Sequence, residues 1–260
     1  MTLHFVRRGA GPPLLLLHPL GAELVVWEPV LHLVAEEHDV VAPDLPGFGR
    51  SPPLPDGGEP TPRALAAAVV ELMDELGLRD AHVAGNSLGA WVALEIAKLG
   101  RARSVTCLAA AGLWSRPLGP RPGVEARTVG RALLPLVPLL VRSARGRRLL
   151  LRGSLARPER VPPHSAARLV RAYVTSPGFS GANAAMRAAV FSGIEKIDVP
   201  VTLAWAELDR LVSPPERPIP GARTLVLRGC GHVPTWDDPE QVARVLLEGS
   251  GARSKERLTA

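Results

Sequence analysis

Short apolar runs alternate with helical stretches along most of this chain. Each run is bounded by turn residues, and the first four are apolar on both faces. The runs are Leu14–His18, Val40–Asp44, His82–Ser87, Ser104–Ala110, Val199–Glu207 and Thr224–Gly229. Short runs without a polar face are typical of strands in a parallel sheet that is covered on both sides. The alternation therefore predicts an open, mostly parallel sheet with helices on both faces.

Helical signals lie between and after these runs. Ala64–Leu76 has apolar residues at helical spacing, and Ser87–Leu99 follows directly on the third run. Gly77 and Gly100 stand just past these two stretches, where C-capping glycines are common. Asp238 is followed by a proline, which is the pattern of an N-cap and a first helical residue. We therefore expect three helices packed against the predicted sheet.

Residues 114–193 interrupt the alternation. They are rich in Pro, Gly and Arg, with helical patches at Val124–Leu134 and Ala166–Val174 and no convincing buried strand. The sequence thus predicts a core formed by residues 1–113 and 194–250, with residues 114–193 inserted as a helical cap. Residues 251–260 contain almost no apolar side chains, and we expect them to form a flexible tail.

The charge is distributed unevenly between these parts. The whole chain carries a formal charge of +6, but residues 114–193 contain fourteen Arg and two Glu, a net +12 that leaves −6 for the rest. Arg far outnumbers Lys, and the residues Ala, Leu, Pro and Gly are abundant, a composition that indicates GC-rich coding. Because GC-rich coding explains the excess of basic residues, we expect no nucleic-acid partner. Two interpretations of the insertion stay open. We favour solvated charge that complements the acidic body; alternatively, the arginines steer anionic substrates, and Arg145–Arg152 resembles a phosphate-binding or membrane-surface patch.

Composition excludes several other classes of protein. With 46% hydrophobic and 22% charged residues over 260 positions, the chain can bury a sizeable core. The apolar runs Leu14–Leu17 and Leu133–Val141 fall short of the roughly 18 to 20 residues that span a bilayer. The N-terminus lacks the apolar region of a secretory signal. Cys107 and Cys230 are too few for a disulfide framework and lack metal-ligand spacing. We expect reduced thiols, a cytoplasmic location and no integral membrane association.

The most informative segment is HVAGNSLGAWVALEIA, residues 82–97. A predicted strand runs into Gly85-Asn86-Ser87-Leu88-Gly89 and a helix begins at once, which is the context that a GxSxG nucleophile elbow requires. A Cβ at either glycine would clash with the neighbouring strand and helix. Ser87 also stands at a helix N-terminus, where free N–H groups and the helix dipole favour developing negative charge. The pattern predicts Ser87 as the nucleophile and the Leu88 amide as an oxyanion donor; the simpler interpretation is a serine N-cap between structural glycines.

A second oxyanion donor is expected in the loop after the first run, His18-Pro19-Leu20-Gly21. This segment resembles an HGxG oxyanion loop with Pro in the second place. Pro19 has no N–H, but the required donor is the Leu20 amide, so no necessary group is lost. We expect His18 to brace the loop rather than to transfer protons.

An acid and a histidine follow the last two predicted strands, in the order that an activated serine needs. Asp209 follows the strand ending at Glu207, and His232 lies in a Gly-rich loop after the final strand. A serine needs a base, and that base needs a carboxylate on its other ring nitrogen to set its tautomer. Glu207 is an alternative acid, whereas Asp237 and Asp238 are expected to begin the last helix. We predict Ser87, His232 and Asp209 as the catalytic residues.

With these residues in this order, the chain resembles the α/β-hydrolase family, from about Leu3 to Glu248. The resemblance is to the cap-bearing branch that includes esterases, lactonases, cofactor-free haloperoxidases and C–C bond hydrolases. The insertion stands where that branch carries its cap, and Asp44–Ser51 is similar to a family loop in which we expect Asp44 to be structural. The resemblance implies an α/β-hydrolase fold and chemistry without a metal or organic cofactor.

The positions at which this sequence departs from the family pattern reduce the number of activities that the resemblance implies. Haloalkane dehalogenases and epoxide hydrolases of the family place Asp where this chain has Ser87, which excludes both activities. The C–C hydrolases usually have a longer Gly-rich oxyanion motif and a Trp after the histidine, whereas Val233 stands here. Residues 213–222 are too short and Pro-rich for the helix usual before the last strand, so that edge is expected to be exposed and the depth of Asp209 stays open. The layout also separates the strands associated with Cys107 and Cys230 by roughly 9 to 10 Å, too far for a disulfide.

The sequence therefore predicts a serine hydrolase that cleaves a small carboxylic ester or lactone through an acyl-enzyme on Ser87. The substrate is a small molecule, and an anionic one if the arginines steer it. The same three residues would serve a perhydrolase or haloperoxidase-type reaction, with peroxide in place of water, or a C–C hydrolase. A non-catalytic ligand-binding protein of the same fold is the least favoured alternative, because it would not need the complete set.

Overall fold

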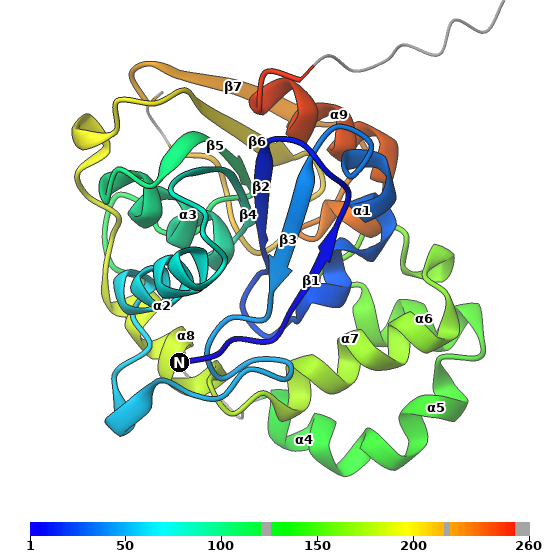
Figure 1. The fold of residues 1–260 in the computed structure, drawn as a ribbon. Helices are drawn as coiled ribbons and strands as arrows, with labels where there is room; N and C mark the ends of the chain where they lie inside the picture. The colour runs from blue at the N-terminus through cyan, green and yellow to red at the C-terminus, as the bar shows by residue number, and fades with distance from the viewer. Residues whose placement is uncertain (121–125, 216–218, 253–260) are drawn as a thin grey trace, which may run out of the picture.

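A seven-stranded sheet forms the centre of the computed structural model, which describes residues 1–120, 126–215 and 219–252 (Figure 1). The strand order is β1-β3-β2-β4-β5-β6-β7; β1 runs antiparallel to β3, and the other neighbours pair in parallel. The strands are β1 (Phe5–Arg8), β2 (Pro13–Leu17), β3 (Asp39–Pro43), β4 (Ala81–Asn86), β5 (Ala102–Leu108), β6 (Val201–Ala206) and β7 (Ala222–Leu227). The predicted mostly parallel sheet is confirmed, with β1 as an addition that the sequence pattern did not reveal.

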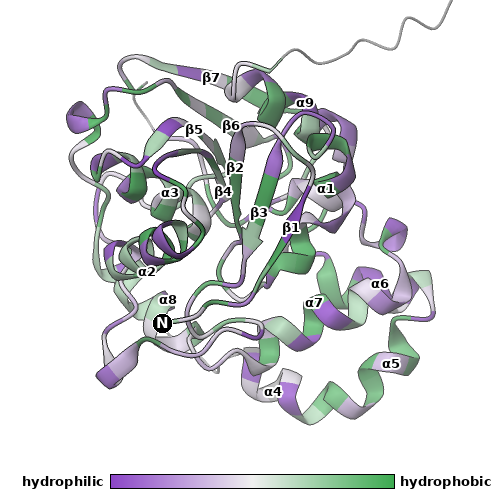
Figure 2. Ribbon diagram, in the orientation of Figure 1, coloured by the Kyte–Doolittle hydropathy of each residue, from purple (hydrophilic) through white to green (hydrophobic). Residues whose placement is uncertain are grey.

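Helices cover both faces of this sheet. In Figure 1, α1 (Glu28–Val34) and α9 (Pro239–Gly249) lie on one side, and α2 (Pro62–Glu75) and α3 (Leu88–Lys98) on the other. Successive side chains of a strand point to opposite faces. In β2, Leu14 and Leu16 accordingly join the core cluster of α1 and α9, whereas Leu15 and Leu17 join that of α2 and α3. Four consecutive leucines are thus buried because each face of the sheet has its own core, visible as apolar strands between the helices in Figure 2.

Helix α9 begins where its capping signal predicted, whereas α2 begins at Pro62, two residues before the predicted start at Ala64, after a cap that was not predicted. The Asp238 Oδ1 accepts a hydrogen bond of 2.9 Å from the Gln241 amide at the start of α9, and Thr61 caps α2 in the same way at 3.1 Å. Both helices have proline in their first turn, where its missing N–H costs nothing. Helix α1, which contains Pro29, was not predicted.

Residues 114–193, which we call the inserted segment, lie between β5 and β6, and their described part contains five α-helices. They lie beyond the carboxyl ends of the parallel strands (Figure 1). They are α4 (Ala126–Leu133), α5 (Val137–Leu140), α6 (Ala144–Leu151), α7 (Pro163–Thr175) and α8 (Phe179–Ala188). Short 3₁₀ helices complete the described chain: η1 (Leu24–Trp27), η2 (Pro55–Gly57), η3 (Leu134–Leu136), η4 (Pro158–Arg160), η5 (Ile194–Lys196) and η6 (Pro234–Trp236). Helices α4 and α7 overlap the two expected patches; α5, α6 and α8 are short and were not predicted.

The β7 edge is open, as the Pro-rich stretch before it indicated. Within residues 207–215 and 219–221 no helix forms, and β7 exposes Arg223, Thr224 and Val226. At the C-terminus, Ser250 Oγ donates to the Leu247 carbonyl and the Ala252 amide donates to the same group. Of the predicted flexible tail, residues 253–260 lie outside the described part of the chain.

The start of α3 packs directly against the ends of β2 and β4. A Cβ on Gly89 would stand 2.1 Å from the Leu17 carbonyl oxygen, and one on Gly85 would stand 2.2 Å from the Gly89 carbonyl carbon. The expected clash at both glycines is therefore present, and it is with backbone atoms that cannot rotate away.

Replacing Gly89 with Ala should lower the free energy of unfolding by at least about 3 kcal/mol, because α3 must move away from β2. Chemical denaturation measures this change. Gly153→Ala is the matched control, since a Cβ there meets no atom within 4 Å; we expect a change of no more than about 1 kcal/mol, in the stabilising direction. Equal stability of the two variants would contradict the close approach.

His18 joins the loop after β2 to the loop after β3. Its fully buried ring accepts a hydrogen bond of 2.9 Å from the Leu45 amide at Nε2, so Nδ1 carries the proton and donates to the Pro19 carbonyl at 2.9 Å. Burial lowers the pKa of His18, although the charge of Asp44 opposes the shift. The ring therefore stays neutral in the folded protein and braces the loop, as the sequence analysis expected.

This neutral histidine should make the protein less stable in acid. Below its ordinary pKa of about 6.5 the unfolded chain binds a proton at His18 that the folded chain does not. The free energy of unfolding should then fall by up to about 1.4 kcal/mol per pH unit from this group alone. In His18→Gln, which keeps an acceptor for the Leu45 amide, denaturation between pH 7 and pH 5 should show a shallower loss; an unchanged slope would contradict the assignment.

Candidate active site

Ser87 stands at the sharp turn from β4 into α3. Its backbone has φ +56° and ψ −113°, a region that non-glycine residues rarely adopt without surrounding support. That support comes from both sides: the Ser87 amide donates to the Leu108 carbonyl at 2.9 Å, and the Ser87 carbonyl accepts from Ala90, Trp91 and Ala111. The side chain forms no cap hydrogen bond, so the simpler interpretation of Ser87 as an ordinary N-cap is wrong.

The two amides predicted as oxyanion donors are both uncommitted. Among the described residues, neither the Leu20 amide nor the Leu88 amide donates a hydrogen bond. Leu88 is the first residue of α3, where helix N–H groups have no partner within the helix. Leu20 follows the end of β2, which pairs with β4 as far as Leu17 opposite Gly85. The pairing of the two strands thus places the start of the Leu20 loop beside the turn that carries Ser87.

His232 and Asp209 form a close, buried pair. His232 Nδ1 and Asp209 Oδ2 are 2.8 Å apart, and the side chains are 7% and 4% exposed. The other carboxylate oxygen, Oδ1, accepts from the Leu211 amide at 2.7 Å and from the Val212 amide at 3.1 Å. Burial alone would raise the pKa of Asp209, but the hydrogen bond and charge of His232 and the two amides outweigh burial and lower it. Asp209, whose depth the sequence left open, is therefore a buried, ionised partner for the imidazole.

Asn86 connects the Ser87 turn to the His232 loop. Its Nδ2 donates to the His232 carbonyl and to the Leu108 carbonyl, each at 3.0 Å. Within the described part of the chain, the Ser87 hydroxyl and the His232 ring form no direct hydrogen bond, and bonds of this kind commonly tighten only with substrate. Asn86 was not predicted as a functional residue, because it occupies a variable place inside GxSxG.

Asp237 ties the His232 loop to the inserted segment. Its carboxylate accepts from the Gly231 amide at 2.8 Å, from Ala156 at 2.9 Å and from Arg157 at 2.7 Å. The expectation that Asp237 begins the last helix is wrong, since only Asp238 caps α9. Three amide donors from two distant segments make Asp237 a buried cross-link, a role that no local pattern could indicate.

The remaining acidic candidates have other partners. Glu207 is exposed and accepts from Arg228 Nη1 at 3.0 Å and from the Gly229 amide at 2.7 Å. Asp44 is buried and accepts from the Leu24 amide at 2.7 Å and the Arg50 amide at 2.9 Å. Asp44 therefore holds the loop after β3 in place, as expected, and Glu207 is engaged away from His232.

The two cysteines are free and buried, with β6 between the strands associated with them, so the absence of a bridge between them is confirmed. Burial raises the pKa of both thiols, that of Cys230 to about 12. Both are therefore protonated and weak nucleophiles. Across the described ranges, no three His, Cys, Asp or Glu side chains are grouped as metal ligands, and no helix is long and apolar enough to cross a membrane.

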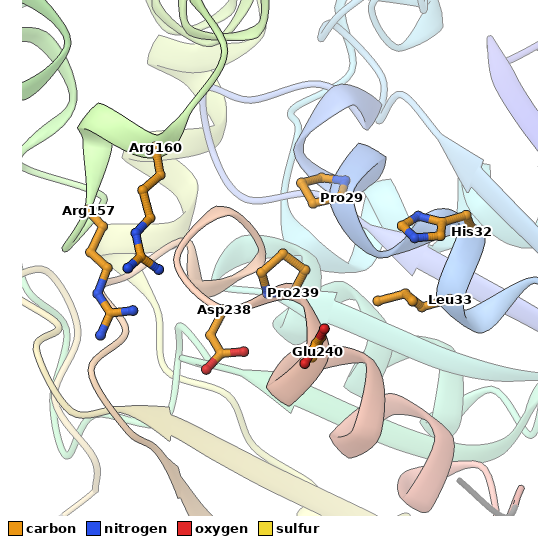
Figure 3. A pocket seen from close by; sticks show the side chains of 8 residues that line it. All are labelled: Pro29, His32, Leu33, Arg157, Arg160, Asp238, Pro239 and Glu240. Carbon is orange, nitrogen blue, oxygen red and sulfur yellow. The ribbon is translucent and has the colours of Figure 1, made fainter. Parts of the chain in front are cut away.

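Two surface grooves lie outside the Ser87 region. One, of about 430 Å³, has Arg157 and Arg160 facing Asp238 and Glu240, so its charges balance (Figure 3). The other, of about 380 Å³, is lined by Glu23 and by arginines of two segments. These arginines are Arg50, Arg168 and Arg171. Ser87, Asp209 and His232 line neither groove.

Comparisons with known proteins agree with this architecture. Residues 14–245 match the model of the alpha/beta hydrolase family. The chain is 32% identical over 198 residues to epoxide hydrolase EphH of Mycobacterium tuberculosis, covering 70% of this chain and 91% of that protein.

Solved structures show the same fold at low identity. A thermophilic esterase from Thermogutta terrifontis superimposes with a TM-score of 0.72 at 24% identity, covering 95% of this chain and 92% of that one. The enol-lactonase from Burkholderia xenovorans gives a TM-score of 0.68 at 19% identity and covers 95% of both chains. The family model spans most of the chain, and the sheet, the turn at Ser87 and the buried His232–Asp209 pair are all in place. This protein is a hydrolase-fold enzyme that belongs to the alpha/beta hydrolase family.

Proposed function

We propose that this enzyme is a serine hydrolase that cleaves small carboxylic esters or lactones through an acyl-enzyme on Ser87. The observation that carries the proposal is the 2.8 Å hydrogen bond between His232 and the buried Asp209, in a loop that Asn86 ties to the Ser87 turn. This arrangement supplies an oriented base beside a serine whose hydroxyl caps nothing.

In the first half of the reaction, His232 removes the Ser87 proton as the serine oxygen attacks the carbonyl carbon. Asp209 holds Nδ1–H, which leaves Nε2 as the base and stabilises the imidazolium that forms. Negative charge then develops on the carbonyl oxygen, and the free amides of Leu20 and Leu88 are the donors that we assign to it. The imidazolium returns the proton to the leaving alcohol, or to the ring oxygen of a lactone.

In the second half, water cleaves the acyl-enzyme. His232 takes a proton from the water, the hydroxide attacks the acyl carbonyl, and Ser87 leaves with the proton returned by the imidazolium. The residues thus perform both steps with acid–base chemistry alone, and we propose no metal or organic cofactor. Peroxide in place of water would lead through the same steps to a peracid.

The chemistry of serine argues against epoxide opening, although one relative is named an epoxide hydrolase. Attack of the Ser87 oxygen on an epoxide carbon would leave an ether, which offers water no carbonyl to attack. Attack on an ester leaves a new ester on Ser87, which water can cleave. The names of the esterase and the lactonase among the structural neighbours fit attack on an ester.

We propose that the inserted segment acts as a cap on a core of residues 1–113 and 194–250. Residues 154–157 lie directly against the His232 loop: the Val233 amide donates to the Ser154 carbonyl at 2.9 Å, and Asp237 receives the Ala156 and Arg157 amides. The cap and the base are therefore held by one set of hydrogen bonds.

We also propose that the enzyme prefers anionic substrates. The groove lined by Arg50, Arg168 and Arg171 is also lined by Glu23, which follows Leu20 by three residues in the chain. Arg168 is paired with Glu23 at 3.0 Å, whereas the other two arginines add positive charge at the seam between core and inserted segment. Charge of this sign would draw a carboxylate-bearing ester toward the enzyme.

Replacing Ser87 with Ala should lower ester turnover by about 10⁴-fold or more, because the nucleophile is lost while the fold is kept. The measurement combines fluorophosphonate labelling, read by intact mass, with hydrolysis of p-nitrophenyl esters of rising chain length, a lactone and styrene oxide. We expect labelling of the wild type at one site, none in the variant, and turnover of esters or the lactone but not of the epoxide. Turnover of the epoxide alone, or a variant with full esterase activity, would overturn the proposal.

Asp237→Asn should lower kcat by about tenfold to a hundredfold with a smaller change in KM, because an amide cannot accept all three N–H groups and the His232 loop shifts. Steady-state kinetics on the best ester measure the effect. Asp238→Asn is the matched control: Asn caps helices as well as Asp does, so its kcat should stay within about twofold of the wild type. Equal kinetics for the two variants would show that Asp237 does not position the base.

A further inference from the structure

Five leucines in the described part of the inserted segment are exposed, and four of them lie close together along the chain, whereas Leu118 stands apart. Leu133, Leu136, Leu139 and Leu149 are between 39% and 65% exposed. They lie within seventeen residues, at the end of α4, in η3, in α5 and in α6. Single exposed leucines are ordinary on protein surfaces, but a cluster confined to consecutive short helices marks an interaction surface.

Arginines stand directly beside these leucines. In α6 and its C-cap, Arg145, Arg148, Leu149 and Arg152 follow at the spacing of one helical face, and all four are exposed. Arg148 pairs with Glu159 at 3.2 Å. In the described part of the chain, the guanidinium groups of Arg142, Arg145 and Arg152 have no hydrogen-bonded or ionic partner. The cluster is therefore apolar and strongly cationic at once.

The scaffold beneath these side chains is fixed. Helices α4, α5 and α6 each pack against α7, and Val137, Val141 and Leu151 are buried on the inner side. Figure 1 shows α4, α5 and α6 along the border of the molecule away from the sheet, and Figure 2 shows apolar and hydrophilic residues interleaved there. The exposed leucines and arginines of this layer form what we call the Leu/Arg face (Leu133, Leu136, Leu139, Leu149, Arg142, Arg145, Arg148 and Arg152).

We propose that the Leu/Arg face docks on a membrane surface rich in anionic lipid. Leucines that reach past a rim of arginines match the two layers of such a surface, an acyl region below charged headgroups. A nucleic acid would use the arginines but leave the leucines in water. The inserted segment carries +12 and the rest of the chain −6, so the field of an anionic membrane turns this face toward it.

The orientation places the Ser87 side of the sheet toward the lipid. The inserted segment lies beyond the carboxyl ends of the parallel strands, where Ser87 also lies (Figure 1). Docking by the Leu/Arg face therefore brings the membrane to the segment that covers the candidate site rather than to the opposite edge. The binding itself does not depend on the proposed ester chemistry and is measured without substrate.

The test is co-sedimentation of the full chain with vesicles of phosphatidylcholine alone and of phosphatidylcholine mixed equally with phosphatidylglycerol. We expect binding to the anionic vesicles only, and weaker binding as salt is added. The variant R142Q/R145Q/R148Q/R152Q should bind more than about tenfold less tightly, since each arginine near such a surface contributes about fivefold. The variant L136S/L139S should lose about tenfold, because its apolar area no longer inserts.

Matched controls carry the same changes on the core. R8Q/R63Q/R79Q/R244Q removes four exposed arginines outside the inserted segment, and L99S/V226S removes two exposed apolar side chains there. Both should bind like the wild type, and thermal unfolding should find all variants folded. Absence of wild-type binding to anionic vesicles, or equal losses in the face and control arginine variants, would overturn the proposal. Full binding by L136S/L139S would also overturn the proposal, because binding would then need only negative charge, which any polyanion supplies.

Discussion

The start of α3 lies so close to the ends of β2 and β4 that neither Gly85 nor Gly89 has room for a Cβ. This contact puts the first helical N–H groups beside the loop that follows β2, and it forces the chain at Ser87 into a left-handed turn. Backbone hydrogen bonds balance the strain: the Ser87 amide donates to the Leu108 carbonyl, and the Ser87 carbonyl accepts from Ala90, Trp91 and Ala111. A parallel sheet buried on both faces is what makes such support possible, because its strand ends cannot move independently.

Buried carboxylates hold the loops at that edge of the sheet. Asp44 follows β3, Asp209 follows β6 and Asp237 lies after β7, and each receives at least two backbone N–H groups. A buried carboxylate is costly unless such donors surround it. The donors in turn lose their freedom, so each aspartate converts a flexible loop into a defined one. Asp44 and Asp209 each bond a histidine ring as well, that of His4 and that of His232, both at 2.8 Å. Asp209 differs in that its histidine lies in the loop that Asn86 ties to the Ser87 turn.

The buried layers were predictable from sequence because they depend on local patterns. Both faces of β2 are apolar, and the cap at Asp238 is a signal within four residues. The meeting of Asp209 with His232, in a loop tied to the Ser87 turn, was predictable because strand order fixes which loops meet. Asn86 and Asp237 were not, since their partners lie 146 and 81 residues away. The short helices α5 and α6 escaped because prolines and arginines hide their periodicity.

The inserted segment is attached to the core at several places, two of which concern the candidate site. Residues 154–157 are bonded to the His232 loop, and Tyr173 and Phe179 crowd Gly21 of the loop after β2 so closely that a Cβ there would lie within 3.0 Å of both rings. Both attachments lie beside groups assigned to the reaction. The helices α4 to α6 instead rest on α7, and their outer residues contribute nothing to the core. Leucines and unpaired arginines on that layer do not stabilise the fold. Their clustering is therefore better explained by binding to the proposed membrane surface than by packing against the core.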